Sequence, residues 1–146
     1  LIGNLSAKRD WGHAKDYVKS MWLILQQDKP DDFVIATGQN YSVRDFIKKS
    51  FEVLGIDIDF KGKGEKEVGY ISKLNQPMKH LKVNDIIIKV DPIYYRPTEV
   101  DTLLGDASKA RQVLNWKPEY NFKTLVEEMI EQDLLLAKQE KLIKEI

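Results

Sequence analysis

The sequence predicts an α/β fold in a single region of ordinary domain size. The chain has 146 residues, which is the length of one domain. Apolar residues make up 42% and charged residues 32%, so the chain can bury a core and keep a polar surface. Stretches with helical spacing of apolar residues alternate with short strand-like runs, which favours mixed helices and strands over either type alone.

The first predicted helix begins near His13, after a polar turn. Its apolar residues recur at helical spacing on one face, and they are Ala14, Tyr17, Val18, Met21, Trp22 and Leu25. The helix ends before Pro30, because proline disfavours helical geometry in the residue that precedes it. Residues 33–37 then form an apolar run that ends at Gly38, which predicts a strand buried on both faces, as in a parallel sheet.

A second helix is predicted to start at Ser42, whose hydroxyl can accept a hydrogen bond from an unpaired backbone N–H. Asp45 takes the place of the usual Glu or Gln and favours the positive end of the helix dipole, so this is a variant capping box. Gly55 is the expected stop. Residues 56–60 alternate apolar and polar side chains, which predicts a half-exposed strand.

The stretch from 61 to 85 is rich in glycine and charge and predicts a loop or a hairpin insertion. Residues 86–88 with Val90 have the pattern of a strand, and residues 100–104 are expected to form another short one.

Two helices are expected near the end of the chain. Asp106 can cap a short helix that runs to Leu114 with Ala110, Val113 and Leu114 facing inward. The last helix is predicted after Asn121. Its apolar stripe consists of Leu125, Val126, Met129, Ile130 and Leu134.

Composition excludes several classes of function. Lys plus Arg and Asp plus Glu both number 23, so the net charge is zero and no overall field attracts nucleic acid or an anionic membrane. The absence of cysteine excludes disulfides, iron–sulfur clusters, thiolate zinc sites and a cysteine nucleophile. Two histidines without metal-ligand spacing give no metal site. Apolar runs are too short to span a membrane, and we expect a cytoplasmic protein.

The catalytic and cofactor signatures of many oxidoreductases are missing. None of the six tyrosines is followed by lysine four residues later, so no Tyr–Lys acid–base pair can form on one helix face. The stretch Gly62-Lys63-Gly64 lacks the spacing of a dinucleotide-binding loop and is interpreted as a charged turn.

Two basic spots lie where predicted elements end, and loops of that kind concentrate binding groups. Arg9 and Arg96 could each grip a diphosphate through their planar guanidinium groups, and Glu99 could accept hydrogen bonds from a sugar diol. The alternative is that both arginines form ordinary surface ion pairs with nearby acidic residues. These partners would be Glu99 or Asp101 for Arg96, and Asp10 or Asp16 for Arg9.

Several runs of residues resemble the C-terminal half of GDP-mannose 4,6-dehydratases, a family of extended short-chain dehydrogenases/reductases. The runs are Gly3-Asn4-Leu5, Arg9-Asp10-Trp11-Gly12-His13-Ala14, residues 31–38, Tyr95-Arg96-Pro97-Thr98-Glu99-Val100, Leu103-Leu104-Gly105-Asp106 and Trp116-Lys117-Pro118. The resemblance covers nearly the whole chain and is weakest from residue 69 to 84.

The resemblance implies a two-part enzyme of which this chain is a fragment. An absent N-terminal Rossmann domain would bind NADP and carry the catalytic residues, with residues 1–55 packing on it and residues 56–146 forming a substrate region. The full-length lyase would convert GDP-mannose to GDP-4-keto-6-deoxymannose with loss of water, as a homo-oligomer, either a dimer or a tetramer. The fragment alone would be inactive.

The same resemblance implies which residues bind substrate. Arg9 and Arg96 match arginines that contact the nucleotide diphosphate, and Glu99 matches a carboxylate near the GDP ribose. Asn4 and Tyr95 match neighbours of the site. Two alternatives remain open, namely another NAD(P)-dependent nucleotide-sugar epimerase or dehydratase, and a non-catalytic module that binds nucleotide sugars or serves oligomerisation.

Overall fold

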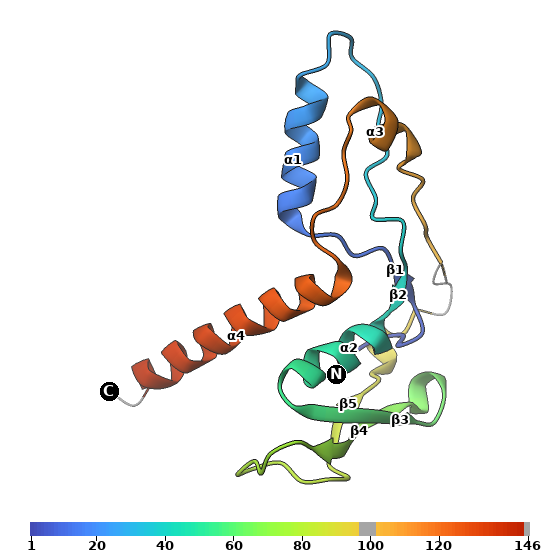
Figure 1. The fold of residues 1–146 in the computed structure, drawn as a ribbon. Coiled ribbons are helices and arrows are strands. Elements are labelled where there is room, and N and C mark those ends of the chain that lie inside the picture. The colour runs from blue at the N-terminus through green and yellow to red at the C-terminus, as the bar shows by residue number, and fades with distance from the viewer. Residues whose placement is uncertain (97–101, 145–146) are drawn as a thin grey trace. The chain divides into compact units, whose positions relative to one another are not determined.

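The computed structural model describes residues 1–96 and 102–144 and confirms the mixed α/β architecture (Figure 1). The chain divides into two compact units, each built from two separate stretches of sequence. The first unit contains Leu1–Trp11 and Gly38–Gly105, and the second contains Gly12–Thr37 and Asp106–Ile146. The resemblance found in the sequence implies a different division, into residues 1–55, which would pack on a domain outside these 146 residues, and residues 56–146. That division stays a prediction.

The first unit contains a three-stranded antiparallel sheet. Its strands lie in the order β3 (Ile56–Lys61), β4 (Val68–Leu74) and β5 (Ile86–Lys89). The strands predicted at 56–60 and 86–88 are therefore confirmed. The uncertain stretch after residue 61 turns out to contain the return strand of a hairpin, with a single turn of 3₁₀ helix, η1 (Gly64–Lys66), before it.

Helix α2 (Val43–Val53) covers this sheet, as Figure 1 shows. It begins as predicted, because the Ser42 hydroxyl accepts from the Asp45 N–H at 3.1 Å and the Asp45 carboxylate accepts from the Ser42 N–H at 2.9 Å. It ends at Gly55, whose φ of 74° is readily adopted only by glycine. The buried core between helix and sheet consists of Leu5, Ile47, Ile56, Ile58, Ile71 and Val90.

The capping box makes the start of α2 sensitive to pH. Partial burial acts to raise the pKa of Asp45, but the hydrogen bonds from Ser42 and the nearby Arg44 and Lys48 outweigh it and lower the pKa below 3.8. A carboxyl whose pKa is lowered by folding stabilises the folded state above its unfolded pKa, and this contribution is lost as pH falls through the folded value.

Ser42→Ala should therefore destabilise the start of α2 by about 1 kcal/mol at neutral pH. Amide hydrogen exchange in the first turn of α2, measured in the complete protein that contains this chain, should become roughly fivefold faster. Asp45→Asn should destabilise the start of α2 at pH 6, and this destabilisation should disappear as the pH falls below 3.8. A cost that is constant with pH would contradict the assigned role of the carboxylate.

The second unit consists of α1 (Ala14–Leu25), α3 (Ser108–Val113) and α4 (Phe122–Lys144). Its core is centred on Trp116, which is fully buried and donates its indole N–H to the Asp16 carbonyl at 2.9 Å. The other buried members of the core are Ala36, Ala107, Ala110 and Leu114, and the partly buried side chains of Leu23, Ile24, Phe33 and Ile35 pack against them. None of the helices in the described ranges is long and apolar enough to cross a membrane.

The apolar stripe predicted on α1 faces solvent. Leu25 is 79% exposed, and Val18, Met21 and Trp22 are all at least 60% exposed, whereas Tyr17 is half-buried. The two buried residues of α1, Asp16 and Ser20, are polar, and Leu23 and Ile24 pack against the core. The Asp16 carboxylate accepts from the backbone N–H groups of Glu119 and Tyr120 at 3.0 and 3.1 Å. The helix itself is confirmed, and the large apolar side chains of Val18, Met21, Trp22 and Leu25 are left exposed.

Other local predictions also differ from the structure. On α4, Met129 and Leu134 of the predicted stripe are 44% and 40% exposed. Residues 33–37 are coil and not a strand, because a strand needs a neighbouring backbone and none in the described chain pairs with this run. In the short helix α3, Ala110 and Leu114 are buried as expected, but Val113 is 54% exposed. Of the strand expected at 100–104, residues 102–104 are coil and the first two lie outside the described residues.

Candidate functional site

The N-terminal stretch of the first unit joins the start of α2 to the end of β5. Strand β1 (Lys8–Arg9) pairs antiparallel with β2 (Tyr41–Ser42), and the Leu5 carbonyl accepts from the Arg44 N–H at 3.0 Å. Ile2 forms a parallel bridge with Val90. The N-terminal stretch, the start of α2 and the residues after β5 are far apart in sequence and therefore lie side by side.

Gly3 allows a second close approach in the same region. A Cβ built on Gly3 would lie 2.3 Å from the Tyr94 carbonyl oxygen, a distance that no real side chain tolerates. Tyr94 ends the 3₁₀ helix η2 (Pro92–Tyr94), whose first turn is held by the Asp91 carboxylate accepting from the Ile93 N–H at 3.0 Å. Glycine at position 3 therefore lets the backbone leading to Arg96 lie directly against the N-terminal stretch.

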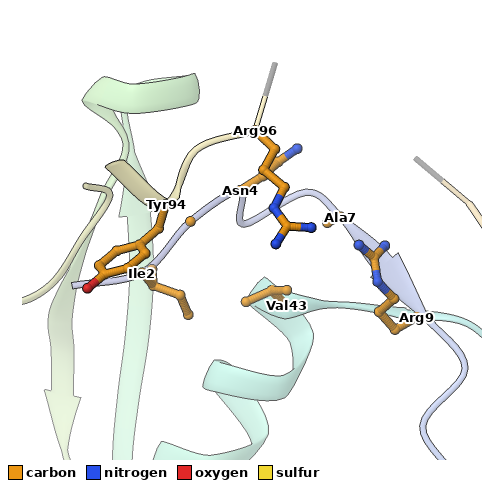
Figure 2. Close-up of a pocket in the computed structure, with 8 residues that line it drawn as sticks. Ile2, Asn4, Ala7, Arg9, Val43, Tyr94 and Arg96 are labelled. Carbon is orange, nitrogen blue, oxygen red and sulfur yellow. The ribbon is translucent and has the colours of Figure 1, made fainter. Parts of the chain in front are cut away.

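A hollow of about 210 Å³ opens where these segments meet (Figure 2). Figure 2 shows the guanidinium groups of Arg9 and Arg96 reaching toward the same space from different segments, above Val43. The complete lining is Ile2, Gly3, Asn4, Ala7, Arg9, Val43, Tyr94 and Arg96.

The lining is cationic and contains no carboxylate among the described residues. Arg9 donates one N–H to the Lys8 carbonyl at 2.7 Å, which fixes part of its side chain. The Asn4 side-chain oxygen accepts from the Ser6 N–H at 2.9 Å, so its amide nitrogen remains as a donor. Guanidinium groups and amide donors are groups that can bind an anion. The hollow is smaller than the roughly 300–1,000 Å³ typical of pockets that enclose a whole ligand.

Of the five site residues predicted from sequence, the structure brings three together, Asn4, Arg9 and Arg96. Tyr95 is not part of the lining; it packs against the core of the first unit, and its neighbour Tyr94 lines the hollow instead. Glu99 lies outside the described residues. Binding roles for all five stay predictions.

Comparison with known proteins identifies the family. The sequence profile of the family described as GDP-mannose 4,6 dehydratase matches residues 1–129. A GDP-mannose 4,6-dehydratase of Yersinia enterocolitica is 51% identical over 98% of this chain, and one of Homo sapiens is 53% identical over 94%. This chain belongs to the GDP-mannose 4,6-dehydratase family. It spans 39% of the length of the first relative and 34% of the second.

Solved structures support the fold. The chain resembles RMD from Pseudomonas aeruginosa, solved with NADPH, with a TM-score of 0.62 and 14% identity over 89% of this chain. It also resembles WbmF from Bordetella bronchiseptica, solved with NAD⁺ and UDP, with a TM-score of 0.57 and 18% identity over 99% of this chain. It covers 34% of each of those chains.

The apolar residues that line the hollow were not predicted from the sequence. Ile2, Val43 and Tyr94 line it, yet each occurs in a sequence context that also suits ordinary packing. Their positions in the sequence could have indicated them, since Val43 follows the cap of α2 and Tyr94 lies two residues before Arg96.

Gly3→Ala is expected to separate the two sides of the hollow. The added methyl group collides with backbone, which cannot rotate away as a side chain can, so overpacking should cost roughly 1–3 kcal/mol. Affinity of the complete protein for GDP should fall with it, as isothermal titration calorimetry would show. Gly69→Ala, where the contacts are side-chain atoms of Phe60 and Ile88, is the matched control and should leave GDP affinity unchanged.

The glycine-rich turn after β3 does not have the geometry of a phosphate-binding loop. Gly62 and Gly64 have φ values of 88° and 58°, and a Cβ on Gly62 would lie 2.4 Å from the Lys66 carbonyl oxygen. Gly62 lies in a tight turn before η1, and Gly64 is the first residue of η1, which has three residues and presents no proper helix N-terminus to a phosphate. The charged-turn interpretation fits this geometry. Within the described ranges, no group of three or more metal-ligating side chains lies together.

Proposed function

We propose that this chain is the C-terminal, substrate-binding part of a GDP-mannose 4,6-dehydratase, and that the hollow holds the diphosphate of GDP-mannose. The observation that carries the proposal is the pair of guanidinium groups, Arg9 and Arg96, on one hollow without a carboxylate in its described lining. Membership of the family supplies the substrate class.

In this proposal the chain binds and orients while the chemistry takes place elsewhere. Arg9, Arg96 and the Asn4 amide hold the diphosphate, and Glu99 accepts hydrogen bonds from the ribose diol. Fixing the diphosphate places the hexose at a defined distance from the catalytic residues and lowers the entropic barrier to reaction. Tyr95 supports the site from the core side.

NADP and the catalytic residues belong, in this proposal, to a part of the enzyme outside these 146 residues. When bound there, NADP would supply reversible hydride transfer, with no net oxidation or reduction over the reaction. No tyrosine of this chain is followed by lysine four residues later, so the catalytic pair would come from that other part.

The exposed stripe of α1 is the proposed contact with that missing part. Monomeric proteins rarely expose a run of large apolar side chains such as Val18, Trp22 and Leu25 without a partner. Residues 33–37 would gain strand partners in the same way, as a late strand of the Rossmann sheet. The cytoplasmic location and the homo-oligomeric state stay predictions.

Turnover assays test the proposal. The complete protein with NADP should convert GDP-mannose to GDP-4-keto-6-deoxymannose, and the isolated chain should show no turnover. UDP- and dTDP-linked hexoses serve as competing substrates. Preference for one of them would favour another nucleotide-sugar enzyme, and binding without any turnover by the complete protein would favour a non-catalytic module.

A further inference from the structure

A buried ion pair lies next to the lining of the hollow without touching it. The Glu67 side chain accepts three short hydrogen bonds from the Arg44 guanidinium, from Nε at 2.9 Å and from Nη2 at 2.7 and 2.9 Å. Glu67 is only 6% exposed, and the Arg44 side chain is 28% exposed. Burial of this kind is unusual for charged residues and requires a partner.

The pair connects three separate segments of the first unit. Arg44 lies in the first turn of α2, and its Nη2 also donates to the Ser6 hydroxyl at 3.1 Å. Glu67 lies between η1 and β4, and its backbone carbonyl accepts from the Val90 N–H at 3.4 Å. Ser6 belongs to the N-terminal stretch and lies between Asn4 and Ala7, both of which line the hollow.

Stability alone does not explain such a pair. Desolvation of two charges offsets much of their attraction, and apolar residues of similar volume often stabilise a fold equally well. An apolar pair could not, however, hold the Ser6 hydroxyl, whereas the planar guanidinium has donors for both Glu67 and Ser6. An apolar pair would therefore lose the contact to Ser6, which lies between two residues that line the hollow.

We propose that Arg44 and Glu67 are positioning residues that hold the stretch from Asn4 to Arg9 in place and thereby set the affinity of the hollow for the diphosphate. This inference rests on the proposed function of the hollow. Lys49 and Glu52 form a contrasting pair on the same helix at 2.9 Å, which joins only neighbouring turns and touches no residue of the N-terminal stretch.

The test compares affinity with stability in the complete protein, with GDP as the probe. Arg44→Met should weaken GDP binding about tenfold, because small displacements of binding groups have large effects. Arg44→Lys should fall between wild type and Arg44→Met, since lysine keeps the charge and loses the planar fork. Lys49→Met, the matched control, should leave GDP affinity unchanged.

Two further variants separate positioning from a purely structural role. The double variant Arg44→Met with Glu67→Leu should recover thermal stability relative to Arg44→Met alone, yet GDP binding should stay weak. Ser6→Ala, at an exposed position, should keep the melting temperature and weaken GDP binding roughly two- to threefold.

The possible outcomes are distinct. Recovery of GDP affinity together with stability in the double variant, or unchanged affinity in Ser6→Ala, would overturn the positioning role and leave the proposed function standing. Wild-type protein that binds no GDP would overturn both.

Discussion

Replacing Arg96 with alanine is expected to weaken GDP-mannose binding by about 10- to 150-fold. One charge-assisted hydrogen-bonding group is worth roughly 1.5–3 kcal/mol, and Arg96 supplies one of the two guanidinium groups on the hollow. The diphosphate is remote from the hexose carbons that react, so the loss should fall on binding more than on kcat. Isothermal titration of the complete protein with GDP-mannose measures it.

A charge-matched control separates a specific contact from a general loss of positive charge. Lys61 in β3 lies over the Tyr70 ring and does not line the hollow, so Lys61→Ala should leave the dissociation constant within about twofold of wild type. An Arg96→Ala variant with wild-type affinity, or equal losses in both variants, would refute the assigned role of Arg96.

Trp116→Ala is expected to destabilise the second unit by about 3–5 kcal/mol. The indole is almost completely buried, and its removal leaves a cavity that the surrounding side chains fill only in part. The substitution also removes the hydrogen-bond donor to the backbone carbonyl of Asp16 in α1. The carboxylate of the same residue accepts from the backbone N–H groups of Glu119 and Tyr120. α1 and the segment before α4 should therefore lose stability together.

Amide hydrogen exchange of α1 and α3 in the complete protein reports this loss locally. Trp116→Phe is the informative comparison, because it keeps most of the ring and removes the N–H donor. Its cost should be smaller, about 1–3 kcal/mol. Equal protection in wild type and Trp116→Ala would show that the core of this unit does not depend on Trp116.

Local structure was predictable wherever local chemistry decides it. Ser42, Asp45 and Gly55 define both ends of α2, because capping and positive φ depend on the residues at those positions alone. The alternating pattern of residues 56–60 likewise gave a strand with Ile56 and Ile58 buried.

Features that depend on distant partners were not predictable in the same way. The spacing of apolar residues gave α1 but not what its stripe contacts, and the buried side of that helix is set by Asp16 and its backbone partners. Residues 33–37 have a strand-like composition, but composition supplies no neighbouring strand. Val113 suits a buried position by residue type and is exposed because Ala110 and Leu114 already fill the core.

The site was only partly predictable for a similar reason. Arg9 and Arg96 were found because their type and loop position suit an anion, and resemblance to a family favoured binding over surface ion pairs. That they share a hollow depends on the Ile2–Val90 bridge and the absence of a side chain at Gly3, neither of which a pattern reveals. The choice between Tyr94 and Tyr95 depends on the orientation of η2.

The most direct test of the diphosphate site compares GDP with guanosine, which has the same base and ribose without the phosphates. Titration of the complete protein should show GDP binding at least 100-fold more tightly than guanosine, roughly 2.7 kcal/mol, with most of that preference lost in the double variant Arg9→Ala with Arg96→Ala. Equal affinities for GDP and guanosine, or a double variant that keeps the preference, would contradict the account.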